Sequence, residues 1–88
     1  MRVASMGKVI VRYRILPDAP ENFQKLRKSL ESLSPDRMDE DPIAFGLKAI
    51  IFTKLVDDRS GSEEELETRI KALPHVETIE TISVTRGF

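Results

Sequence analysis

The sequence predicts an α+β domain in which four strands and two helices follow the order β-α-β-β-α-β. The first observation is that apolar and polar residues alternate in two segments, 8–16 and 45–56, which is the period of a strand. The second is a pair of apolar stripes at helical spacing. The third is a segment rich in β-branched residues at 76–86, typical of a last strand.

The first strand and the first helix are predicted in residues 8–34. Apolar residues occupy every second position of 8–16, as in a half-buried strand. The spacing of Asp18 and Glu21 then predicts a capping box at the start of a helix. Pro35 is expected to end this helix. The buried stripe of this helix consists of Phe23, Leu26, Leu30 and Leu33.

The remaining elements are two strands, a helix and the last strand. The polar segment 37–41 predicts an edge strand, and 45–56 is the longest apolar alternation in the chain. Ser62 and Glu65 have the spacing of a second capping box. The buried stripe of the second helix consists of Leu66, Ile70 and Leu73.

This order is the split pattern of ferredoxin-like α/β sandwiches, a four-stranded antiparallel sheet with two helices on one face. We expect a single domain over 1–88, with 1–5 as a disordered N-terminal extension. The other sheet face is left for solvent or a partner. Strand parity assigns to this open face Ile10, Arg12, Arg14, Lys48, Ile50, Phe52 and Lys54.

Composition excludes several functions. The net charge of −1 provides no overall attraction to nucleic acid or to an anionic membrane. The chain has no cysteine and one histidine, which argues against a thiolate nucleophile or a transition-metal site. No apolar run approaches the roughly 20 residues that span a bilayer. We therefore expect a cytoplasmic protein with no metal, no cofactor and no membrane partner.

No catalytic motif is found. Ser60 and Ser62 have no plausible histidine partner, and Gly61 belongs to no phosphate loop. The acids at 39–41 form one run, which is typical of a solvated loop. His75 follows a proline at a predicted turn, where a histidine is most often an exposed turn residue and not part of a site. A small phosphatase on this fold is disfavoured, because no arginine-lined phosphate loop accompanies a water-positioning amide.

A ferredoxin-like module that binds RNA or a small ligand is the alternative from another class. Such sheets stack bases on exposed aromatic side chains. The residues that favour it here are Arg12, Arg14, Lys48 and Lys54, with Phe52. The usual Gly-aromatic-Gly motif of RNA-binding strands is absent, and aromatic residues make up only 6% of the chain. We expect no direct nucleic-acid binding.

Phe45 has two conflicting interpretations. Pro42 fits the first position of the predicted long strand, where it removes no ladder hydrogen bond, and Gly46 permits a close approach beside Phe45. Parity with Leu47 places the Phe45 ring in the core, and the pattern alone favours this reading. The position between Ala44 and Gly46 favours exposure instead.

The run 41–48, Asp-Pro-Ile-Ala-Phe-Gly-Leu-Lys, resembles the acidic-Pro-Ile-Ala-Phe-Gly-Leu run of the archaeal elongation factor 1-beta family. The resemblance covers residues 6–88. Its members are guanine-nucleotide exchange factors for elongation factor 1-alpha. The resemblance implies that the protein binds this partner in its GDP-bound and nucleotide-free states. It implies release of GDP by disturbance of the magnesium and phosphate site, without covalent chemistry.

The resemblance also implies which residues contact the partner. In similar exchange factors a glycine-flanked aromatic enters a hydrophobic pocket of the G protein, which points to an exposed Phe45. A basic residue near the end of the last strand reaches toward the magnesium and phosphate region. Arg86 falls there, where eukaryotic relatives carry lysine. The partner-binding residues implied are Pro42, Phe45, Gly46, Lys48 and Arg86.

Overall fold

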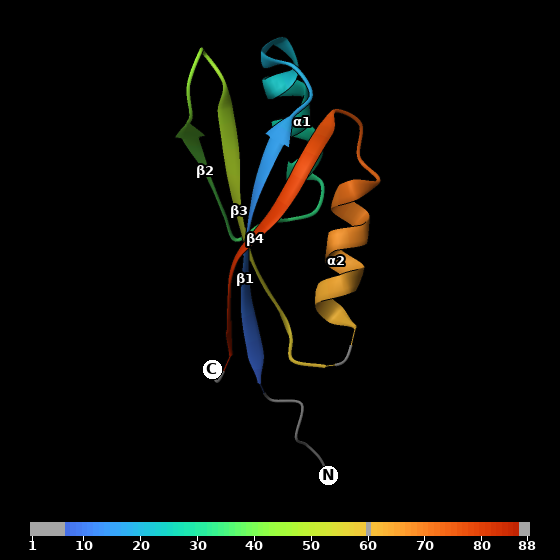
Figure 1. Ribbon diagram of the computed structural model, residues 1–88. Coiled ribbons are helices and arrows are strands. Elements are labelled where there is room, and N and C mark those ends of the chain that lie inside the picture. The colour runs from blue at the N-terminus through green and yellow to red at the C-terminus, as the bar shows by residue number, and fades with distance from the viewer. Residues whose placement is uncertain (1–6, 60, 87–88) are drawn as a thin grey trace.

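The computed structural model describes residues 7–59 and 61–86 (Figure 1). The predicted extension at 1–5 lies outside these residues. The elements are β1 (Lys8–Pro17), the 3-10 helix η2 (Pro20–Asn22), α1 (Phe23–Glu31), β2 (Arg37–Pro42), β3 (Lys48–Asp57), α2 (Ser62–Lys71) and β4 (Val76–Arg86). All strand pairs are antiparallel, in the order β2-β3-β1-β4. The predicted ferredoxin-like α+β fold is confirmed.

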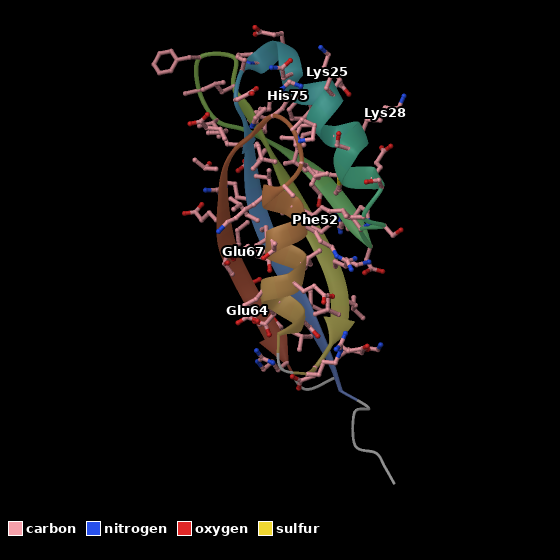
Figure 2. All side chains as sticks on the ribbon, turned by 90° about the vertical axis from the view of Figure 1, so that its right-hand side faces the viewer. Lys25, Lys28, Phe52, Glu64, Glu67 and His75 are labelled. Carbon is pink, nitrogen blue, oxygen red and sulfur yellow. The ribbon has the colours of Figure 1, made fainter. Side chains whose placement is uncertain are left out.

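Both helices lie on one face of the sheet, and the core fills the space between the layers (Figure 1). The predicted helical stripes are confirmed for Phe23, Leu26 and Leu30 of α1 and for Leu66 and Ile70 of α2, which are buried. Leu33 and Leu73 lie just beyond the helix ends and are only partly buried against the core. The sheet contributes Val9, Val11, Tyr13, Ile15, Ile50 and Phe52. Figure 2 shows that Lys25 and Lys28 occupy the outer surface of α1 instead.

The predicted parity of β3 is wrong. Phe52 pairs with Tyr13 and Ile50 pairs with Ile15, and all four side chains are buried in the core. Lys48 and Lys54 have the same parity, so these positions also face the helices. β3 begins only at Lys48. Residues 45–47 lie outside the strand, so they do not determine which face of the sheet each β3 side chain occupies.

The open face of the sheet keeps only part of its predicted set. Ile10, Arg12 and Arg14 lie on this face as predicted, beside Leu55, Thr53 and Ile51 of β3. Because β3 is apolar on both faces, its sequence pattern does not distinguish one phase from the other. The pairing with β1 makes that choice.

Neither predicted capping box forms. Asp18 accepts a hydrogen bond from the side chain of Asn22 at 2.8 Å, and its own N–H donates to the carbonyl of His75 at 2.9 Å. Before α2, the N-cap position is taken by Gly61 with a φ of 88°. Ser62 therefore becomes the first residue of the helix, where its hydroxyl is buried without a hydrogen bond.

The two ends of the sheet carry different elements. Pro42 pairs with Lys48 where β2 and β3 join, whereas Arg86 pairs with Val9, which in turn pairs with Val56. With a rise of about 3.3 Å per residue from Lys48 to Val56, these two places are roughly 26 Å apart along the sheet. No helix in the described part of the chain is long and apolar enough to cross a membrane.

Candidate partner-binding site

A tight turn joins β2 to β3 at one end of the molecule (Figure 1). The N–H of Ile43 donates to the carbonyl of Leu47 at 2.8 Å, and the N–H of Leu47 donates to the carbonyl of Ala44 at 2.9 Å. The two central residues, Phe45 and Gly46, have φ values of 55° and 78°. Two positive φ values in succession define a type I′ hairpin turn.

Phe45 is strained and fully exposed. Side chains of L-residues crowd the backbone at positive φ, so glycine, asparagine and aspartate are the usual occupants of this position. Phenylalanine occupies the position here, and this residue is also 100% exposed. The prediction that parity places it in the core is wrong, because it lies in the turn and outside β3. The interpretation that favours exposure is correct.

The neighbours of Phe45 have distinct structural roles. Pro42 is the last residue of β2 rather than the first of the long strand, and β2 is an edge strand, where proline is tolerated. A Cβ added to Gly46 would have no atom within 4 Å, so the glycine matters for its φ and not for space. Ile43 is 51% exposed beside the turn, a residue that the sequence interpretation did not select.

Lys48 connects the base of the hairpin to α1. Its Nζ lies 4.5 Å from the centroid of the Phe23 ring and 3.1 Å from Oε1 of Glu40. The other oxygen of Glu40 lies 2.9 Å from the guanidinium of Arg27 on α1. A cation over an aromatic face is attracted to it, and the added carboxylate holds the ammonium in place. Lys48 and Glu40 therefore connect the two strands of the hairpin to Phe23 and Arg27 of α1.

Arg86 lies at the opposite end of the sheet, where β4 ends. One guanidinium nitrogen is 2.7 Å from Oδ1 of Asp58, and the other pairs with Glu63 at the start of α2. Its side chain remains 52% exposed. The fold thus does not bring Arg86 and Phe45 together. The acidic residues that hold Arg86 are Asp58, which follows β3, and Glu63 on α2. The alternation pattern of the last strand does not predict these partners.

Two further groups have shifted pKa values, Tyr13 in the middle of β1 and Asp18 near the hairpin end. Burial and the nearby acids of α2 raise the pKa of Tyr13 to about 12, and its hydroxyl donates to the carbonyl of Glu63 at 3.3 Å. Near the hairpin end, the hydrogen bond from Asn22 and then the contacts with His75 lower the pKa of Asp18. No cluster of three or more potential metal ligands occurs among the described residues.

The fold and the projecting aromatic hairpin define a small interaction domain, and comparisons with known proteins specify its class. The family model described as EF-1 guanine nucleotide exchange domain matches residues 10–86. Elongation factor 1-beta of Methanoregula boonei is 40% identical over 83 residues, covering 91% of this chain and 98% of the relative. Its counterpart in Methanocella arvoryzae is 34% identical over 89 residues, covering 94% of this chain and 100% of the relative.

Elongation factor 1-beta of Methanosarcina acetivorans is 32% identical over 88 residues, covering 92% of this chain and 99% of the relative. These matches show that the chain belongs to the archaeal elongation factor 1-beta family. A guanine nucleotide exchange role in translation elongation follows from this membership.

Proposed function

We propose that the protein accelerates GDP release from elongation factor 1-alpha by inserting Phe45 into a hydrophobic pocket of that partner. The observation that carries the proposal is the fully exposed ring on a strained turn. Strain of this kind concentrates at functional sites, and a single aromatic anchor is the usual form of an interface hot spot. The tight turn orders the ring before contact, which reduces the entropy lost on binding.

Arg86 acts at the second contact. Its guanidinium competes electrostatically with the magnesium ion at the nucleotide phosphates of the partner. To do so it leaves Asp58 and Glu63, so these two acids set how readily it is released. The inserted Phe45 ring and the released Arg86 guanidinium together favour a nucleotide-free arrangement of the partner. No covalent bond changes.

Binding and exchange are linked thermodynamically. If this protein weakens GDP binding by some factor, GDP weakens the binding of this protein by the same factor. The protein therefore binds the nucleotide-free partner more tightly than the GDP form. This difference lets the protein leave after GTP enters, and one molecule serves many partners.

The test is release of a fluorescent GDP from preloaded elongation factor 1-alpha, with excess GTP and a substoichiometric amount of this protein. We expect strong acceleration with multiple turnovers. No acceleration of a partner shown to be active would refute the proposal.

The alternative of an RNA-binding sheet loses most of its support. Phe52 is buried, and Lys48 and Lys54 face the helices. Of the basic set, only Arg12 and Arg14 remain on the open face, and Arg14 pairs with Asp41 at 3.2 Å. The described part of this face has no aromatic residue on which a base could stack.

A further inference from the structure

We propose that Glu40 is a positioning residue that fixes the direction in which the hairpin presents Phe45. This inference rests on the proposed function and names the residues that hold the ring in place for it. Every residue from Pro42 to Gly46 is exposed. Because the tip therefore has little packing against the rest of the domain, its direction depends on how the base of the hairpin is held.

The base of the hairpin lies at the edge of the sheet. β2 has six residues and pairs with β3 alone. At the end of this ladder Glu40 pairs with Ile50, and Pro42 pairs with Lys48. Ile50 is buried under the helices, and alternation places Glu40 and Lys48 on the same face of the sheet. Both side chains thus lie on the side that α1 covers.

Glu40 bridges two cations that belong to different elements. Its Oε1 lies 3.1 Å from Nζ of Lys48, and its Oε2 accepts a hydrogen bond from the Arg27 guanidinium at 2.9 Å. The Lys48 Nζ is in turn 4.5 Å from the centroid of the Phe23 ring. Phe23 and Arg27 are four residues apart and so are neighbours on one side of α1. The four side chains form a closed ring, the Glu40 network, that connects both strands of the hairpin to α1.

The α1 side of the Glu40 network is anchored in the core. Phe23 is only 5% exposed and packs within the hydrophobic core, so it provides a fixed point for Lys48. The side chains of Glu40 and Lys48 are 37% and 39% exposed, and partly buried charges are screened less by salt than fully exposed ones. Because a single carboxylate holds both cations, loss of its charge frees Lys48 and Arg27 together.

A second ion pair restrains the hairpin from the open face of the sheet. Asp41 lies 3.2 Å from the guanidinium of Arg14 on β1, which ties β2 across β3 to the centre of the sheet. A strand held on one face alone can tilt, whereas restraints on both faces oppose the tilt. Neutralising Glu40 should therefore loosen the hairpin and leave β2 in place through Asp41.

The experiment compares the parent with Glu40→Gln, which keeps the size of the side chain and removes its charge. Amide order parameters from NMR relaxation should fall from about 0.85 to about 0.6 for residues 43–47. In the exchange assay, KM for GDP-bound elongation factor 1-alpha should rise about fivefold, the scale of a partly exposed ion-pair network. The maximal rate should stay the same, because the loosened hairpin loses more entropy on contact but binds in the same way.

Two further variants make the test specific. Arg27→Gln removes the other end of the Glu40 bridge and should reproduce both effects. Asp39→Asn is the matched control, because Asp39 pairs at 2.8 Å with Arg37 of the same strand and so ties β2 to no other element. It should behave like the parent. Unchanged order parameters in Glu40→Gln, or an equal fall in Asp39→Asn, would overturn the proposal.

A double variant separates this inference from the proposed function. If Glu40 acts through Phe45, then Glu40→Gln should not slow exchange further in a Phe45→Ala background. Further slowing there would mean that Glu40 acts independently of the ring, and it would overturn the positioning role. If Phe45→Ala alone exchanged like the parent, the proposed function would fail, and the order parameters would still decide whether Glu40 holds the hairpin.

Discussion

The hairpin tip and the end of β4 present Phe45 and Arg86, the two side chains that we propose to contact the partner, in opposite ways. Phe45 at the tip is fully exposed and held on a backbone conformation that phenylalanine disfavours. Arg86 at the other end adopts an ordinary strand position and is held by Asp58 and Glu63. One side chain is ready for a partner before contact. The other must exchange its present partners for new ones.

The difference follows from the chemistry of each side chain. An apolar ring gains free energy whenever it leaves water, so a rigid turn that keeps it exposed is sufficient for binding. A free guanidinium would attract any anion nearby, and intramolecular carboxylates restrict it to partners that compete successfully with them. We expect Phe45 to determine affinity and Arg86 to determine the effect on the nucleotide.

The largest expected effect is that of Phe45→Ala. Loss of an aromatic anchor typically weakens an interface by about 2 kcal/mol or more, and a loss of about 2.8 kcal/mol corresponds to exchange about 100-fold slower. Stability should change by less than about 0.5 kcal/mol, because no packing is lost. Stopped-flow GDP release and a thermal melt measure the two. Ile82→Ala, which truncates a 43% exposed side chain of β4, is the control. A large fall in melting temperature would contradict this account.

Two substitutions at the other end should act in opposite directions. Arg86→Ala should slow exchange about 30-fold, because it removes a charge-assisted contact of about 2 kcal/mol. It should affect the affinity for elongation factor 1-alpha less. Glu63→Gln weakens the intramolecular restraint and should accelerate exchange. Glu67→Gln, which alters another acid of α2, is the control (Figure 2). If Glu63→Gln slowed exchange as Arg86→Ala does, the ion pair would have only a structural role.

The fold should also lose stability at high pH, because of Tyr13 in the middle of β1. Because the pKa of Tyr13 is about 12 in the folded state and about 10 when unfolded, the unfolded state ionises first. The stabilisation is complete below pH 10 and lost between pH 10 and pH 12, by about 3 kcal/mol. Denaturant unfolding of the parent and of Tyr13→Phe measures it. The parent should lose stability relative to Tyr13→Phe across this window, and an unchanged difference between the two curves would contradict the assignment.

The smallest expected effect concerns the strain at the tip. Asparagine tolerates positive φ, so Phe45→Asn should stabilise the fold by about 1 kcal/mol, equivalent to roughly 4–8 °C in melting temperature. Exchange should nevertheless be as slow as in Phe45→Ala. A melting temperature at or below that of Phe45→Ala would show that the turn stores no strain.

Much of this architecture could be predicted from local pattern. The stripe from Phe23 to Leu33 and the alternation of β1 indicated their elements because each has a single apolar face. β3 did not allow this, since Ala49 and Ile51 are as apolar as Ile50 and Phe52. The capping boxes failed for another reason. The Asp18 carboxylate is engaged by the side chains of Asn22 and His75, and α2 has Gly61 as its N-cap in place of Ser62.

The sequence by itself determined the order of elements and the run 41–48, and thereby the resemblance to the family. Local propensity and periodicity are properties of neighbouring residues, so they can be read along the chain. Only the tertiary structure decided the phase of β3, the exposure of Phe45 and the ion pairs of Arg86. The phase of β3 and the ion pairs of Arg86 depend on contacts between residues far apart in sequence, because strand register and charge pairing are settled by the partner segment. The exposure of Phe45 follows from the turn at 43–47, which places the ring outside β3.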